Sequence, residues 1–149
     1  MVSESAQRLG GVLMTDQRSA SEAVMILWLT AGTDSALAAI LEREVIIGAI
    51  HISRGEMGLQ FDATSVPVLA APGGVAVEQL DGDALSEGIQ SVLRRLKARL
   101  KSGEENAVST VMGVLADQLA FFVFDKGDEV IGPGWTLDYA GRTYPLKPA

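Results

Sequence analysis

The chain has no cysteine and only one histidine among its 149 residues. Without cysteine it cannot form disulfides, a thiolate nucleophile, an iron–sulfur cluster or a cysteine-ligated zinc site. A single histidine also excludes any zinc site that needs two or three imidazole ligands. We therefore expect no metal centre in this protein.

Sequence motifs for nucleotide binding and for serine activation are missing as well. The chain contains neither the Walker phosphate-binding pattern nor the Gly-x-Gly-x-x-Gly pattern of dinucleotide-binding proteins. It also has no Gly-x-Ser-x-Gly turn. His51 is the only possible imidazole base, and it lies within a predicted strand, on the same face as Ala49 and Ser53. We interpret His51 as a half-buried histidine bonded to a neighbour, with a general base or ligand-orienting group as the alternative. The sequence thus predicts no cofactor, and His51 is its one candidate for catalysis.

Charge and hydropathy narrow the possible partners and locations. The net charge of -7 argues against general affinity for nucleic acids or anionic membranes. No basic N-terminal segment precedes an apolar stretch, and no apolar run reaches the roughly 18–20 residues that a membrane-spanning helix needs. We expect a soluble, cytoplasmic or particle-associated protein without a signal peptide, membrane insertion or a nucleic-acid partner.

Length and composition indicate one domain over residues 1–149. A chain of this size with 48% hydrophobic residues can bury a single core, and no linker-like shift in composition divides it. Residues 1–12 are expected to form a loose N-terminal arm. Residues 144–149 are expected to be an extended tail because they contain two prolines.

The first predicted element is ambiguous between helix and strand. Ser19 and Glu22 have the spacing of a capping box, which favours a helix over residues 21–31. Residues 23–30 are also a continuous apolar run of strand length, which could pair with residues 10–15 as a hairpin. We predict the helix, with the hairpin as the alternative, and a short second helix over residues 35–44.

The rest of the chain reads as strands around one helix. Strands are expected over residues 45–53, 57–63, 66–70, 75–80, 108–116 and 119–125, and as a hairpin over residues 135–139 and 142–146. Residues 83–101 have a single apolar stripe at helical spacing, formed by Leu85, Ile89, Val92, Leu93, Leu96 and Leu100. The predicted fold class is α+β: a mostly antiparallel sheet packed with one long amphipathic helix (83–101) and one or two N-terminal helices. In element order the middle of the chain is similar to the small acidic secretion chaperones.

The end of the predicted helix has an unusual charge. Residues 81–101 carry five basic and three acidic residues, whereas the remainder of the chain carries seven basic and 16 acidic residues. One interpretation is a solvated helix face. The other is docking of this face on the acidic surface of an identical subunit or another protein. The candidate interface residues are Trp28, Arg94, Arg95, Lys97, Arg99, Lys101 and Trp135, of which the two tryptophans could instead belong to the core.

These observations support three functional hypotheses. The first is a non-catalytic, self-assembling subunit of a larger particle, such as a virion or a secretion machine. The second is a chaperone or adaptor that binds an extended peptide by strand addition. The third is a small-molecule binding protein or an enzyme that uses His51.

Overall fold

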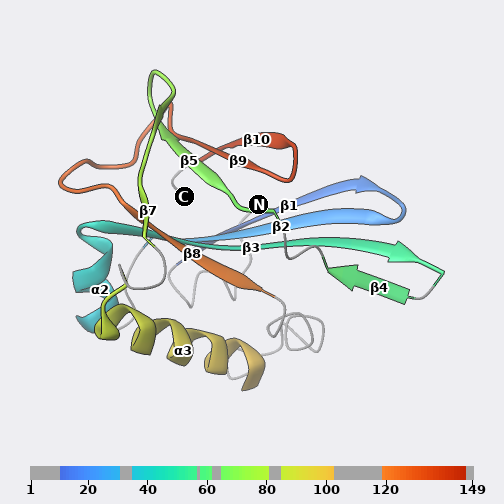
Figure 1. Ribbon diagram of the computed structural model, residues 1–149, viewed down its shortest axis with the longest axis horizontal. Helices are drawn as coiled ribbons and strands as arrows, with labels where there is room; N and C mark the ends of the chain where they lie inside the picture. The colour runs from blue at the N-terminus through green and yellow to red at the C-terminus, as the bar shows by residue number, and fades with distance from the viewer. Residues whose placement is uncertain are drawn as a thin grey trace.

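The computed structural model describes residues 11–30, 35–56, 58–61, 65–80, 85–102 and 119–146. Within these residues it contains ten strands and two helices (Figure 1). The strands are β1 (Gly11–Ser19), β2 (Glu22–Leu29), β3 (Glu44–Gly55), β4 (Gly58–Phe61), β5 (Val68–Ala71), β6 (Val75–Ala76), β7 (Gln79–Leu80), β8 (Ala120–Asp125), β9 (Thr136–Tyr139) and β10 (Arg142–Pro145). The helices are α2 (Ser35–Leu41) and α3 (Glu87–Ser102).

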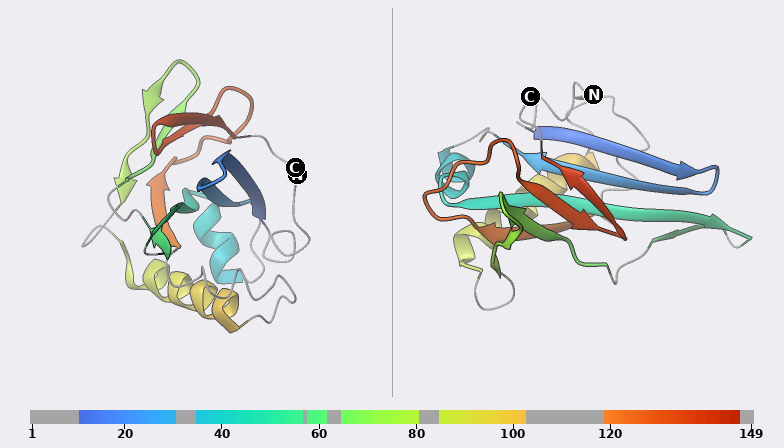
Figure 2. Two further views of the ribbon diagram at one scale, coloured as in Figure 1. Left: turned by 90° about the vertical axis from the view of Figure 1, so that its right-hand side faces the viewer. Right: turned by 90° about the horizontal axis from the view of Figure 1, so that it is seen from above.

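The strands form two antiparallel sheets, which we call sheet A and sheet B. Sheet A has the order β1-β2-β3-β8-β7, with β4 also paired to β3, and sheet B has the order β10-β9-β5-β6. Sheet A is the middle layer: the two helices lie against one of its faces and sheet B lies over the other (Figures 1 and 2). The protein therefore has a buried layer on each side of sheet A.

Two clusters of buried side chains correspond to these layers. The cluster between sheet A and the helices consists of Leu27, Leu29, Leu37, Ile46, Ile50, Ile89, Val92, Leu119 and Val123. The cluster between the two sheets consists of Val12, Val24, Ile26, Trp28, Val45, Ile47, Ala49, Leu69, Phe124, Trp135, Leu137, Tyr139 and Leu146. Residues of β2, β3 and β8 alternate between the two clusters, as expected for strands covered on both faces.

The helix predicted over residues 21–31 is wrong, because this segment forms β2 and pairs with β1 as a hairpin. The run of apolar residues has a physical reason: Val24, Ile26 and Trp28 point toward sheet B, and Leu27 and Leu29 point toward the helices. A strand buried on both faces has no polar side and loses the alternation that identifies most strands.

The residues interpreted as a capping box instead flank the turn of this hairpin. Ser19 pairs with Glu22 at the end of the ladder, and the backbone N–H of Ser21 donates to Oγ of Ser19 at 3.1 Å. Serine side chains bond to nearby backbone in turns as well as at helix ends, so the spacing alone could not separate the two structures.

The predicted fold class is therefore also wrong. The described part of the chain is mostly antiparallel sheet with two short helices, rather than a sheet packed with one long amphipathic helix and one or two N-terminal helices. Sheet B, rather than a helix, lies over the second face of sheet A (Figures 1 and 2). The sequence pattern identified many of the strands, but it could not show that they divide into two stacked sheets.

Helix α3 begins at Glu87, later than the predicted start at residue 83. The N-cap is Ser86, whose Oγ accepts the backbone N–H of Ile89 at 3.2 Å. Ile89 and Val92 are buried against sheet A. The two acidic residues expected to start the helix, at positions 81 and 83, lie outside the described residues.

Several predicted elements are confirmed. The strand predicted over residues 45–53 is β3, and the short helix predicted over residues 35–44 is α2. The predicted C-terminal hairpin is β9 and β10, in which Ala140 and Gly141 form the turn with φ of 49° and 84°. Positive φ at both central residues is typical of the two-residue turn that suits the twist of a hairpin.

The strand predicted over residues 75–80 is divided between the sheets. Its first part, β6, pairs with β5 in sheet B, and its last part, β7, pairs with β8 in sheet A. Between the two parts, the N–H of Val77 donates to the carbonyl of Leu69 at 2.8 Å, and the carbonyl of Glu78 accepts from Asp125 at 2.9 Å. This crossing ties the sheets together at one end of the molecule.

The predicted arm and tail lie partly within the strands. Residues 11 and 12 of the expected N-terminal arm begin β1, and Val12 is buried. Tyr144 and Pro145 belong to β10, and Leu146 is buried in the cluster between the sheets. The remaining residues of the arm and tail, and the strand predicted over residues 108–116, lie outside the described residues. Among the residues that are described, no helix is long and apolar enough to cross a membrane.

Candidate functional site

His51 lies on β3 and faces sheet B, on the same side of the strand as Ala49. Its side chain is 17% exposed, and Nε2 lies 2.6 Å from Oε2 of Glu22 on the neighbouring strand β2. The carboxylate partner is therefore Glu22, a residue that the sequence analysis did not connect with His51. This contact belongs to a larger group of polar side chains between the two sheets.

We call this group the sheet clasp, and it consists of Asp16, Arg18, Glu22, His51, Arg142 and Tyr144. Arg18, on β1, donates from Nη1 to the carbonyl of Ala140 at 2.5 Å and from Nη2 to Oη of Tyr144 at 2.8 Å. Tyr144 in turn donates to Oδ2 of Asp16 at 2.7 Å. The guanidinium also fixes the turn in which Ala140 adopts its positive φ. The clasp thus joins the β1–β2 hairpin of sheet A to the β9–β10 hairpin of sheet B.

The clasp is a set of matched charges at neutral pH. The hydrogen bond from Tyr144, together with those from Arg18 and Arg142, holds the pKa of Asp16 below its ordinary value despite opposition from burial. Burial raises the pKa of Tyr144, and its bond to Asp16 raises it further, so the phenol stays protonated. Among the described residues no buried side-chain nitrogen or oxygen lacks a hydrogen-bond partner. The hydrogen bonds among the clasp residues support a structural role for the clasp, as a link between the two sheets.

Replacing His51 with Ala is expected to lower the free energy of unfolding by about 1–2 kcal/mol, the cost of losing a hydrogen bond to a carboxylate in a part-buried site. Thermal unfolding of the wild type and of His51→Ala measures this loss. An unchanged melting temperature together with loss of binding to a screened small molecule would instead place His51 in a functional site.

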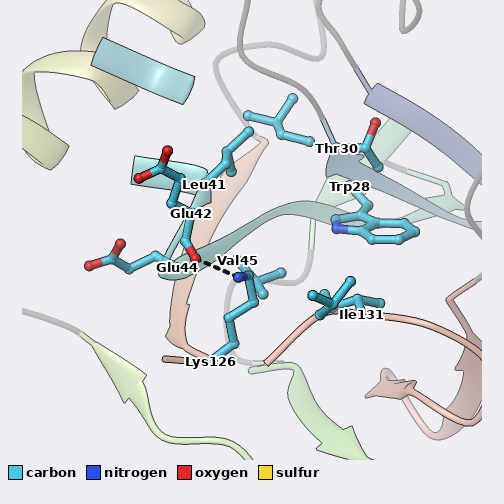
Figure 3. Close-up of a pocket in the computed structure, with 10 residues that line it drawn as sticks. Trp28, Thr30, Leu41, Glu42, Glu44, Val45, Lys126 and Ile131 are labelled. Carbon is cyan, nitrogen blue, oxygen red and sulfur yellow. Dashed lines mark hydrogen bonds between the residues drawn. The ribbon is translucent and has the colours of Figure 1, made fainter. Parts of the chain in front are cut away.

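A second feature is a pocket at the end of the molecule where β3 begins and β8 ends (Figure 3). This end pocket has a volume of about 410 Å³, and its lining includes Trp28, Leu29, Leu41, Val45 and Ile131. At its rim the Lys126 amino group donates to the carbonyl of Glu42 at 2.7 Å. Figure 3 shows the carboxylates of Glu42 and Glu44 pointing away from the Trp28 indole. The pocket therefore combines an apolar floor with a charged rim.

Acidic residues from four segments lie at this end of the molecule: Glu42 and Glu44 line the pocket, and Glu78, Asp125 and Glu129 line an adjoining hollow that shares Lys126 and Val130 with it. We call them the acidic end, which consists of Glu42, Glu44, Glu78, Asp125, Asp128 and Glu129. Glu44 pairs directly with Asp125 across β3 and β8, and Arg43 reaches Asp128 at 3.4 Å. Burial raises the pKa of Glu44, and the neighbouring Asp125 raises it further. The repulsion between carboxylates at this end is only partly offset by Arg43 and Lys126.

The structure places the predicted basic residues on one helix. Arg94, Arg95, Lys97, Arg99 and Lys101 all belong to α3, which lies on the face of sheet A opposite sheet B. Arg94 and Arg95 are exposed. The only acidic residue of the helix is Glu87 in its first turn. Basic residues near a helix C-terminus also complement the helix dipole.

The two predicted tryptophan anchors are both buried between the sheets. Trp28 is 5% exposed and Trp135 is 3% exposed. Trp28 contributes to the lining of the end pocket, and Trp135 lines a neighbouring hollow together with Val75 and Val130. Their role as interface anchors stays a prediction, and their packing in the core is observed.

Sequence reasoning missed the sheet clasp. Its signal was weak but present: residues 12, 14, 16 and 18 share one face of a strand, so Asp16 and Arg18 continue the inward face of Val12. Assigning that face requires β1 to be recognised as a strand, which the preferred helix over residues 21–31 did not suggest.

No group of three or more acidic or histidine side chains among the described residues could hold a metal ion. Comparison with protein-family models, with curated proteins and with solved structures gives no match for this chain. The functional argument therefore rests on the clasp, the end pocket and the distribution of charge.

Proposed function

We propose that this protein is a non-catalytic subunit that assembles with copies of itself into a larger particle. The observation that carries the proposal is the separation of charge: the acidic residues lie around the end pocket and the adjoining hollow, whereas α3 has five basic residues between Arg94 and Lys101 and no acid among them. Opposite patches on one chain allow each copy to attract the next, and this attraction speeds association as well as fixing orientation.

The two charged regions lie apart along the molecule. The N-terminal part of α3 contacts α2, which ends beside the acidic end (Figure 1). A helix rises about 1.5 Å per residue, so Arg94 lies roughly 10 Å and Lys101 roughly 21 Å along the axis from Glu87. The basic group thus extends away from the acidic end of its own copy. A contact between unlike patches of two copies is heterologous, and it builds rings or filaments.

The first test is the mass in solution, measured by light scattering after size exclusion at two salt concentrations. We expect oligomers at about 0.05 M salt and a shift toward smaller species at about 0.5 M, because the screening length falls from roughly 14 Å to roughly 4 Å. A species with the mass of one chain under both conditions would contradict the proposal.

A charge exchange makes the test specific to these patches. Arg94→Glu alters the basic patch and Glu129→Lys alters the acidic end, and both residues are exposed. Each variant alone is expected to form smaller species than the wild type at low salt, and an equimolar mixture is expected to assemble again because each altered patch now matches the other. The matched controls are Arg54→Glu and Glu56→Lys, which make the same charge changes at exposed positions at the end of β3 and in the turn that follows it. Controls that impair assembly equally would show a general charge effect.

A further inference from the structure

The long edge of sheet A lies at β1. This strand has nine residues and pairs with β2 on one side, and no strand among the described residues pairs with its other side. The remaining edges of the described sheets are less suited to pairing: β4, β6 and β7 have at most four residues, and β10 contains Pro145. Proline cannot donate a ladder hydrogen bond.

The two halves of β1 differ in how well they resist pairing with another strand. From Asp16 onward, two charged side chains point inward to the sheet clasp, and the register shifts between Gln17 and Ser19. Inward charges and bulges are devices that keep an edge strand from adding a neighbour. Gly11–Thr15, in the other half, has no charge, no proline and no register shift. Within the part of the chain that the structure describes, this half is therefore an unprotected edge.

We propose that a second copy of this chain pairs with this edge, β1 against β1, in an antiparallel arrangement centred on Leu13. The usable length sets this register: pairing Gly11 with Thr15 of the other copy uses all five unprotected positions on both chains. Leu13 then lies opposite its own counterpart. The resulting contact is self-complementary, as a two-fold dimer requires.

The layers of the two copies match in this register. Directly opposite residues of antiparallel strands have side chains on the same face. Val12 and Met14 pack toward the cluster between the sheets, and they lie opposite each other. Leu13 packs toward the cluster under the helices and meets Leu13 of the other copy. Apolar side chains therefore meet apolar side chains on both faces, and no like charges are brought together.

This surface is separate from the charged patches, so the inference does not depend on the proposed function. Pairing through uncharged residues persists at high salt, whereas the contact between the acidic end and α3 weakens. Working at about 0.5 M salt isolates the edge contact from the charged one. If both contacts form, each copy has two kinds of interface, which is sufficient for an extended assembly.

Cysteine cross-linking tests the register, because the chain contains no cysteine of its own. Residues opposite each other in an antiparallel pair have Cα atoms about 4.5–5.5 Å apart, which is within the range that a disulfide spans. Leu13→Cys is expected to form a disulfide dimer rapidly under mild oxidation at high salt. The matched control is Gln17→Cys, whose two copies would be separated by about eight residues, or roughly 27 Å.

Amide hydrogen exchange of the unmodified chain provides a second measurement that needs no variant. Alternate amides within residues 11–15 are expected to be protected in concentrated protein and to exchange at least about tenfold faster after dilution to monomer. Protection that is independent of concentration would show that another segment of the same chain covers the edge, and it would overturn the proposal. Absence of protection would do the same.

A third outcome would favour a different partner. A peptide of alternating Val and Thr, added in excess, offers an extended strand of unrelated sequence. Protection that depends on this peptide rather than on protein concentration, without cross-linking of Leu13→Cys, would overturn self-pairing and indicate capture of extended peptides.

Discussion

Replacing Phe124 with Ala is expected to lower the free energy of unfolding by about 3–5 kcal/mol. Phe124 is 1% exposed and lies on β8, pointing into the cluster between the two sheets. Removing the ring leaves a cavity between two sheets whose strands are held by their ladders and cannot collapse to fill it. The loss corresponds to a fall in melting temperature of roughly 6–20 °C for a chain of this size.

Phe122→Ala is the matched control, because it removes the same ring from the same face of the same strand. Phe122 is only partly buried against that cluster, so we expect its loss to cost less than half as much. Chemical denaturation of both variants measures the difference. Equal losses would mean that the cluster between the sheets does not centre on Phe124 and that the two sheets pack differently.

The elements that could be predicted from the sequence are those in which residue pattern, residue type and turn residues all indicate the same secondary structure. The β9–β10 hairpin has alternating residues on either side of Ala140-Gly141, and β3 is rich in Ile and Val. Gly48 shows what such local signals leave out. A Cβ at this position would lie 3.1 Å from Cε1 of Phe121 on the neighbouring strand, so a larger residue would require the Phe121 ring to shift, and the glycine relates to packing rather than to a turn.

The elements that were predicted wrongly depend on tertiary context. An apolar run such as residues 23–30 fits a buried helix and a buried strand equally well until its neighbours are known. The division of residues 75–80 between two sheets has the same origin, because alternation is continuous along the segment although its partners change. Layering is a property of contacts between distant segments, which one sequence does not encode locally.

The candidate sites also divide into those that local sequence shows and those that depend on tertiary contacts. The basic residues of α3 fall within eight consecutive positions, so they could be found by counting charges. The acidic end is assembled from the residue that follows α2, from β3 and from the segments around β7 and β8, and no spacing rule connects them. The sheet clasp joins Arg18 to Tyr144 across 126 positions of sequence. These last two groups are completed by contacts between distant segments, which the three-dimensional structure supplies.

Replacing Arg18 with Ala is expected to lower the free energy of unfolding by about 2–3 kcal/mol. The side chain is only 10% exposed, so solvent screens its contacts little, and its removal takes one donor from the Ala140 carbonyl, one from the Tyr144 hydroxyl and one from the Asp16 carboxylate. The turn at Ala140, which has a positive φ, also loses its bond to sheet A. Because the clasp joins the two sheets, the effect should exceed that of an ordinary surface ion pair.

Arg142→Ala is the matched control, since Arg142 contacts the same carboxylate at 2.9 Å but is 55% exposed. We expect a loss of less than about 1 kcal/mol, as is usual for an exposed pair. Denaturation of the two variants at neutral pH makes the comparison. Losses of equal size would show that the clasp acts as a set of surface charges and not as a link between the sheets.

The pH dependence gives the Arg18→Ala experiment a second readout. The pKa of Asp16 is lowered in the folded protein, first by the bond from Tyr144 and then by Arg18 and Arg142. The stability that this carboxylate contributes is present above its ordinary pKa and is lost as the pH falls through the lowered value. The difference between wild type and Arg18→Ala should therefore shrink below about pH 4, as Asp16 becomes protonated in both. A difference that stays constant down to acid pH would mean that Arg18 stabilises the fold through its bonds to the β9–β10 turn alone.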